Sequence, residues 1–479
     1  MPSSSTWGWS ADSCLWQSLH SGRSAVPRSF LLVLLAAIFL PAAAHAEPTE
    51  AWQAPTLSIT RYDEDWSVVA ASDVRDQHWT GQFKYIPISE DAWLSTGIEL
   101  RVRHENLDNN LWGDAEAPGD SYVWFRALPY ADLHVGKLRA FVQPIASTSA
   151  SVAPTPGPID QTGIDLLQGF VEAEFGPVIL RGGRQMLSLG TERLIGTRYG
   201  PNVPLAFDGL RANIRLGAAV TVSLLAVKPV QARKGDINDR TSHDKSLWGA
   251  YAVLPGLDLY YLGYRSDAAR WGNREGTEAR HSLGARFHGS RDDWHWNIEG
   301  VYQFGRFAGG PISAWTVGTE IGHAFPEAPL SPDLTLRVNA ISGDGNRSDD
   351  RLGTFNAMFP KGKYFGELSP VGPYNIVNAY SALGLRLSSK VSASLAGVAY
   401  WRYSTADGIY DIPGNLVRAA GGTRARFIGT LIEGVVSWQA NAELELSASI
   451  SAFAPGAFIR ATGSAKTIHM LGLESNFRF

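Results

Sequence analysis

The sequence has few charged residues, few lysines and a single cysteine. Only 18% of its 479 residues are charged, against roughly 25% in an ordinary soluble domain. The 46 acidic residues nearly balance the 42 basic ones, of which only 9 are lysine, so a basic nucleic-acid binder is excluded. With 44% hydrophobic residues the chain is too apolar to be intrinsically disordered. Low charge, 49 glycines and a strong preference for arginine fit a protein with a nonaqueous exterior.

One short apolar run near the N-terminus predicts an export signal. Residues 30–40 are all apolar, Arg23 and Arg28 precede them, and the small-x-small sequence of residues 44–46 follows. This is the pattern of a Sec signal peptide, and the run is shorter than the about 20 residues of a membrane-spanning helix. We therefore expect residues 1–46 to be the signal peptide and residues 47–479 the mature domain. Cleavage would remove Cys14, which excludes disulfides and cysteine-ligated metal from the mature chain.

The rest of the chain lacks a long apolar run and shows alternation instead. In residues 98–103 apolar residues alternate with Glu or Arg, and residues 334–339 and 442–451 follow the same period of two. That period predicts half-buried β-strands. A soluble sheet and a membrane barrel both produce it, with the apolar face turned inward in the first and outward in the second.

Three features favour the barrel. The polar faces are rich in Arg and Glu, and the C-terminal Phe479 ends an amphipathic strand, which looks like the assembly signal of bacterial outer-membrane barrels. Aromatic residues also cluster near predicted strand ends, as in interfacial girdles: Tyr260, Tyr261, Trp294, Trp296, Trp401, Tyr403 and Trp438. We therefore predict an all-β fold, a single transmembrane antiparallel β-barrel with short periplasmic turns and long extracellular loops.

The alternation predicts about eighteen strands. Their centres are expected near residues 100, 126, 142, 171, 182, 212, 223, 250, 261, 284, 299, 318, 337, 383, 397, 432, 447 and 474. Long loops are expected near 106–120, 148–164, 190–205, 229–245, 266–279, 342–375, 404–425 and 454–466.

Motifs spread over the mature chain carry a resemblance to a known family. They lie at residues 61–67, 84–88, 99–105, 183–188, 193–194, 198, 200–203, 207–209, 351–366, 372–375, 407–411, 413–415, 453, 458 and 461–463. In these segments the chain resembles the alginate export family of outer-membrane β-barrels. The resemblance implies a monomeric eighteen-stranded barrel that passes an anionic polysaccharide passively through an arginine-rich constriction.

Arginines on the polar faces are the candidate lining of such a pore. Arginine is permanently charged and its planar fork suits carboxylates such as those of uronate polymers. The candidate pore residues are Arg101, Arg103, Arg126, Arg139, Arg184, Arg193, Arg198, Arg211, Arg215, Arg286, Arg337, Arg386 and Arg402, with Glu99, Glu172 and Glu299 among the acidic counterparts. Arg181 and Arg184 have opposite parity and cannot both face inward without a bulge. The alternative is that these charges only pair with one another and stabilise the wall.

No motif indicates catalysis, a cofactor or a metal. Residues 344–350 alternate oxygen-bearing side chains but fail the EF-hand pattern, so a solvated turn is favoured over a calcium site. Residues 360–364 are read as either a ligand contact at the outer surface or an ordered, packed loop. The leading hypothesis is an outer-membrane channel for anionic polysaccharide or uronate oligomers, in contact with outer-membrane lipid and with periplasmic export proteins as further partners. A porin for small organic acids is the alternative.

Overall fold

Eighteen antiparallel strands form the wall of a closed barrel in the computed structural model, which describes residues 54–479. Two short strands, β1 (Ile86–Ser89) and β9 (Arg240–Thr241), extend the same sheet. The predicted signal peptide lies outside the described residues. The wall strands are β2 (Ala92–Asp108), β3 (Asp120–Val135), β4 (Leu138–Ala150), β5 (Gly163–Phe175), β6 (Val178–Met186), β7 (Ala206–Leu216), β8 (Val220–Gln231), β10 (Lys245–Leu254), β11 (Leu257–Trp271), β12 (Arg274–Arg291), β13 (Trp294–Phe307), β14 (Gly310–Ala324), β15 (Asp333–Ile341), β16 (Ile376–Arg386), β17 (Val391–Arg402), β20 (Phe427–Gln439), β21 (Leu444–Pro455) and β22 (Ile468–Arg478).

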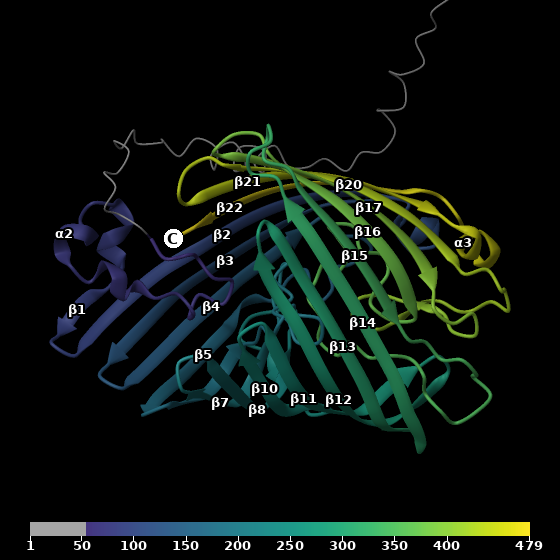
Figure 1. Ribbon diagram of the computed structural model, residues 1–479, viewed down its shortest axis with the longest axis horizontal. Coiled ribbons are helices and arrows are strands. Elements are labelled where there is room, and N and C mark those ends of the chain that lie inside the picture. The colour runs from purple at the N-terminus through teal and green to yellow at the C-terminus, as the bar shows by residue number, and fades with distance from the viewer. Residues whose placement is uncertain (1–53) are drawn as a thin grey trace, which may run out of the picture. The chain divides into compact units, whose positions relative to one another are not determined.

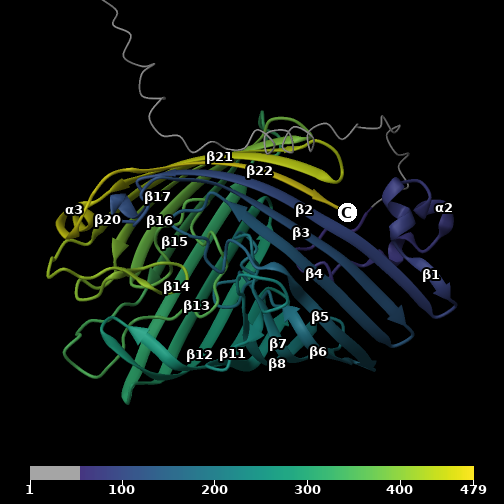
Figure 2. The ribbon, with the colours of Figure 1, turned by 180° about the vertical axis from the view of Figure 1, so that it is seen from behind.

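Each strand pairs with its neighbours in sequence, and the last strand closes the wall against the first. Strand β22 pairs with β2 from Glu99 opposite Arg478 to Asp108 opposite His469. Figures 1 and 2 show the strands side by side around the wall, with loop segments inside the ring. All eighteen predicted strand centres fall within wall strands, so the predicted fold class is confirmed.

The period of two arises because one face of each strand meets lipid and the other the lumen. Val171, Leu210 and Ile450 on the outer face are each more than 60% exposed, whereas Glu99 and Arg101 on the inner face are almost fully buried. An apolar side chain that is exposed on this wall is therefore exposed to lipid. Among the described residues, no helix is long and apolar enough to cross a membrane.

The two ends of the barrel differ in their connections. The end that carries the C-terminus, here the turn end, has short turns such as residues 136–137 and 255–256. The opposite end, here the loop end, carries the long connections 109–119, 151–162, 187–205, 232–244, 342–375, 403–426 and 456–467. Short helices and a hairpin occupy the ends: η1 (Trp66–Val69), α2 (Ser72–Arg75) and η2 (Trp79–Phe83) before β1, η3 (Asn110–Gly113), α3 (Ala457–Thr462), and β18 (Ile409–Tyr410) with β19 (Leu416–Arg418).

Two details of the prediction were wrong. The expected long loop at 266–279 is a hairpin in which β11 and β12 continue to Trp271 and Arg274, with only residues 272–273 between them. Tyr260 is not part of an outer girdle, because its side chain is buried in the lumen and its Oη donates to Glu299 Oε1 at 2.6 Å. Trp294 and Trp438 do lie exposed near the turn end.

Candidate functional site

Two long loops fold into the lumen and meet there. Loop 187–205 and loop 342–375 join through Gly196 N–H to the Phe359 carbonyl (2.8 Å) and Phe359 N–H to the Leu194 carbonyl (2.9 Å). Ile195 and Leu194 are buried in this contact. We call the place where these two loops meet the wall the constriction, because the backbone and buried side chains of both loops occupy part of the lumen at this level.

Arginines of β2 and β3 hold loop 187–205. Arg101 donates to the carbonyls of Tyr199 (3.0 Å) and Pro201 (2.7 Å). Arg126 donates to the same Pro201 carbonyl (3.1 Å) and pairs with Glu99 at 2.6 Å. Both guanidinium groups are buried under the loop, with residue exposures of 1% and 0%. These two predicted pore residues anchor a loop and do not line an open passage.

Loop 342–375 is held by a second charged group. Arg103 pairs with Glu367 of the loop at 2.8 Å and with Glu474 of β22 at 2.9 Å. Burial raises the pKa of Glu367, but Lys363 and Arg103 outweigh that effect and bring the pKa below its usual range. Glu433 accepts the backbone N–H of Glu367 at 2.8 Å. The segment 360–364 is therefore an ordered, packed part of a lumenal loop.

Arg193 links the two loops to the far wall. Its Nε pairs with Glu299 of β13 at 3.0 Å, and its Nη1 donates to Tyr364 Oη at 3.0 Å. Asn339 of β15 accepts a further contact at 3.3 Å. Arg193 and Glu299, both predicted site residues, are thus brought together at the constriction.

Some lumenal cations have no carboxylate partner within ion-pair distance among the described residues and are not held by loop carbonyls either. Arg198 of loop 187–205, Lys361 of loop 342–375 and Arg211 of β7 are of this kind. Arg211 reaches only Ser223 Oγ, at 3.1 Å. Burial lowers the pKa of Arg198, and burial together with Arg337 and Arg193 lowers that of Lys361. An anion beside these groups would offset the free-energy cost of burying their positive charge. These three side chains are therefore the best candidates for ligand contact.

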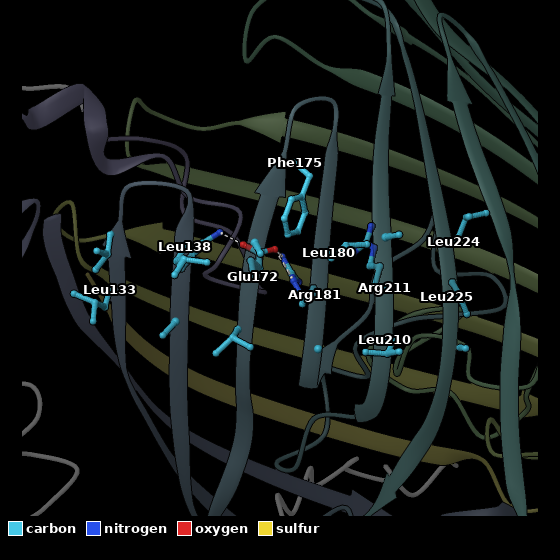
Figure 3. Close-up of a pocket in the computed structure, with 18 residues that line it drawn as sticks. Leu133, Leu138, Glu172, Phe175, Leu180, Arg181, Leu210, Arg211, Leu224 and Leu225 are labelled. Atoms are coloured by element: carbon cyan, nitrogen blue, oxygen red, sulfur yellow. Dashed lines mark hydrogen bonds and ion pairs between the residues drawn. The ribbon is translucent and has the colours of Figure 1, made fainter. Parts of the chain in front are cut away.

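Several other predicted residues pair within the wall. Arg139 and Arg181 both bind Glu172, at 3.2 and 2.7 Å. Figure 3 shows Glu172 and Arg181 pointing toward each other from neighbouring strands. Further pairs join Arg286 to Asp258 (2.9 Å), Arg337 to Glu320 and Arg215 to Glu174 (3.1 Å). These side chains pair with carboxylates of neighbouring strands, as the alternative interpretation of the lumenal charges expects.

Two predicted arginines lie at the ends of strands. Arg402, at the end of β17, is fully buried and donates to loop carbonyls, including that of Ala425 at 2.6 Å. It therefore holds the base of loop 403–426. Arg386, at the turn end of β16, is exposed, and its side chain forms no hydrogen bond or ion pair within residues 54–479.

The predicted lumenal position of Arg184 is wrong. Along β6, Arg181 faces inward and is buried, while Leu180 is 47% exposed on the outer face. Arg184 has the parity of Leu180 and pairs with Asp208 at 2.8 Å. The strand keeps its register without a bulge, so Arg184 lies on the outer face near the loop end.

Sequence reasoning missed two buried groups. Arg280 of β12 is 0% exposed and donates to Gln303 Oε1 at 2.7 Å. Its parity matches that of Arg286, but it followed a segment that was expected to be a loop. Asp407 accepts from Arg347, Tyr410 and Thr354 (2.7, 2.8 and 2.6 Å) and so ties the outer loops together.

Residues 344–350 form turns in which side chains accept backbone N–H groups. Asp344 accepts from Asn346, and Asp349 accepts from Arg351. Within the described part of the chain, no three His, Cys, Asp or Glu side chains are grouped so as to hold a metal ion.

Comparison with known proteins gives a family and a fold. Residues 92–471 match the alginate export family model. No curated protein matches the chain significantly. Among solved structures, Acinetobacter baumannii OccAB1 is 15% identical, with a TM-score of 0.55 over 83% of this chain and 99% of that one. Pseudomonas aeruginosa OccK2 (OpdF) in complex with glucuronate is 12% identical, with a TM-score of 0.54 over 81% of this chain and 98% of that one. Pseudomonas aeruginosa OpdK with vanillate is 10% identical, with a TM-score of 0.54 over 80% and 98%.

Proposed function

Because this chain belongs to the alginate export family, we propose that it passes an anionic polysaccharide such as alginate, or its oligomers, through an anion-selective lumen. The chain is an outer-membrane β-barrel and a transport protein rather than an enzyme. The turn end then faces the periplasm and the loop end the exterior. Passage is passive and the barrel acts as a monomer in this proposal.

The observation that carries the proposal is the set of lumenal cations without a carboxylate partner. Arg198, Lys361 and Arg211 keep donors free while most neighbouring arginines are engaged by Glu, Asp or loop carbonyls. Uronate polymers carry one carboxylate per sugar, and a guanidinium binds a carboxylate with two parallel hydrogen bonds. Several weak sites in series allow a polyanion to enter and still leave.

Single-channel recording in planar bilayers tests this proposal. In a KCl gradient we expect a reversal potential of anion-selective sign, and we expect uronate oligomers to block the current. Neutral oligosaccharides of the same length serve as the control and should block far less. Cation selectivity, or equal block by both kinds of oligomer, would contradict the polyanion proposal.

A porin for small organic acids is the second candidate. The packing of loops 187–205 and 342–375 inside the lumen favours it, because small solutes need less room than a polymer. The complex of OccK2 with glucuronate adds that a barrel of this fold binds a single uronate. Liposome swelling separates the candidates. A porin for small acids should admit glucuronate, should exclude longer uronate chains, and should conduct ions without being blocked by those chains.

A further inference from the structure

The segment before the barrel enters the lumen and covers part of its inner wall. Residues 58–66, here the lumenal insert, lie against β3 to β6. Tyr62 Oη donates to the Met186 carbonyl at 2.8 Å, and Arg139 Nη2 donates to the Tyr62 carbonyl at 2.6 Å. Gln168 of β5 donates to the Thr60 carbonyl at 3.1 Å. Figure 1 shows the N-terminal elements α2 and β1 at the same end of the barrel as the C-terminus.

The wall beneath the insert is aromatic. Tyr62, Tyr130, Phe141 and Phe170 form one buried cluster. The Tyr62 ring meets Phe170 edge-on at 5.4 Å, and the Arg181 guanidinium lies 3.9 Å from the Tyr62 ring centre. The wall residues of this cluster face the lumen. Without the insert their rings would meet water, which apolar surface disfavours.

The insert holds one arginine against three carboxylates, and two of these, Asp63 and Asp65, are exposed. Arg61 pairs with Glu64 at 2.9 Å, with both side chains at most 1% exposed. The arginines that it covers, Arg139 and Arg181, are already neutralised by Asp132 and Glu172 in the wall (2.8 and 2.7 Å). The insert therefore takes up space in the lumen, and the unpaired charges that it adds are negative, so it offers no extra cation to an anionic solute.

Arg61 anchors the insert to the barrel, and Trp66 packs it against the segment that follows. Arg61 Nη2 donates to the backbone oxygen of Phe479 at 2.7 Å. Trp66 is 2% exposed, donates to Glu64 at 2.9 Å and lies 4.2 Å from Lys84 Nζ. Displacing the segment would expose the Arg61–Glu64 pair and three aromatic rings of the wall together.

We propose that the lumenal insert is a stationary element that sets the size limit of the passage at its periplasmic side, while the constriction sets charge selectivity. This inference rests on the proposed channel function. For the substrate, this means that the insert limits the cross-section of any solute that passes, whatever the charge of that solute. Loss of the insert therefore enlarges the passage and keeps its preference for anions, because the only cation of the insert, Arg61, is paired with Glu64.

Deletion of residues 58–64 from the full-length precursor tests the inference. We expect a higher single-channel conductance, by roughly twofold, and entry of larger neutral polyethylene glycols, with a reversal potential that keeps its anion-selective sign. The matched control is Val68→Ala, because Val68 belongs to the same N-terminal segment but is 56% exposed. Unchanged conductance and an unchanged polymer cutoff in a folded deletion variant would overturn the inference, as would a reversal potential of cation-selective sign.

A chemical readout keeps the test decisive if the deletion variant does not fold. The mature chain is expected to be free of cysteine, so Phe141→Cys introduces a single thiol beneath the insert. Here the full-length barrel is compared with Tyr62→Ala, which loosens the insert. We expect a water-soluble methanethiosulfonate to leave Phe141→Cys unmodified in the full-length barrel and to react once Tyr62 is replaced. Arg386→Cys, at an exposed position, is the reactive control.

Rapid modification of Phe141→Cys in the otherwise unchanged barrel would show that the insert does not cover this wall. Protection that persists in the Tyr62→Ala background would also count against the inference. The thiol readout does not depend on ion flow. If the unmodified chain forms no channel, the proposed function fails while the position of the insert can still be judged.

Discussion

Two arginine-rich regions of one lumen use the same side chain differently. Beneath the lumenal insert, Arg139 and Arg181 are neutralised by carboxylates of neighbouring strands. At the constriction, Arg101 donates to loop carbonyls, and Arg198 has no carboxylate partner in the described chain. The strand face on which an arginine lies thus does not decide its role. Its role is decided by the groups from elsewhere in the chain that fold against it.

The largest effect is expected from Arg126→Ala. The change removes the partner of Glu99, which is only 2% exposed, and two donors that hold loop 187–205. An unpaired buried carboxylate costs about 3–5 kcal/mol. We expect the free energy of unfolding, measured by urea in lipid vesicles with tryptophan fluorescence, to fall by that amount. Arg386→Ala is the control and should be neutral; an equal loss in both variants would remove the distinction between anchoring and free arginines.

A smaller effect, on selectivity alone, is expected from the double variant Arg198→Glu with Lys361→Glu. Neither side chain forms an ion pair within residues 54–479, so stability should change little. Replacing two cations by two anions should shift the reversal potential towards cations and weaken uronate block by roughly tenfold, or about 1.4 kcal/mol. The control pair is Arg215→Glu with Arg386→Glu at the periplasmic rim. If the rim variant shifts selectivity as much, the constriction is not the selective part of the lumen.

The smallest expected effect is on the pH dependence of stability and concerns Lys84. This residue lies behind the insert and also lacks an ion pair in the described chain. Its Nζ donates to Tyr130 Oη at 2.6 Å and to the Thr96 carbonyl at 2.7 Å. Burial, together with the charge of Arg61, lowers the pKa of Lys84 to about 7, against about 10.4 in an unfolded chain. Above pH 7 the unfolded chain therefore binds a proton that the folded chain has released, so stability rises with pH.

Between about pH 7 and about pH 8 this difference adds about 1 kcal/mol to the free energy of unfolding. Lys84→Met should lack this rise, which the same urea titration at the two pH values measures. Lys137→Met, at an exposed turn position, is the control and should behave as the unmodified chain does. A rise that persists in Lys84→Met would assign the pH dependence to another group.

The wall could be predicted from sequence because lipid and lumen impose opposite demands on alternate residues. Residues 98–103 show this contrast fully, and their strand is placed as expected. The contrast disappears where strands extend past the membrane. Residues 266–279 are polar on both faces, so they look like a loop although they form a hairpin.

The site was only partly predictable, because its contacts join residues far apart in sequence. Parity placed Arg101 and Arg126 correctly on the inner face. Nothing local to β2 or β3 shows that Pro201, about a hundred residues away, lies over both side chains. The prediction for Arg184 was wrong for a simpler reason, since a single regular strand cannot turn both Arg181 and Arg184 inward.

The N-terminal segment also supplies a pairing partner for the first residues of β2, which the last strand is too short to reach. The chain ends at Phe479, whose N–H donates to the Ile98 carbonyl, and this leaves the first residues of β2 without β22 beside them. Strand β1 takes that place, with Ile86 opposite Leu94 and Ser89 opposite Ala92. A barrel truncated to begin at residue 91 would display an open strand edge, the kind of surface onto which a foreign strand adds. By pairing with β2, strand β1 satisfies this edge from within the chain, so the edge is not open to a strand of a neighbouring copy.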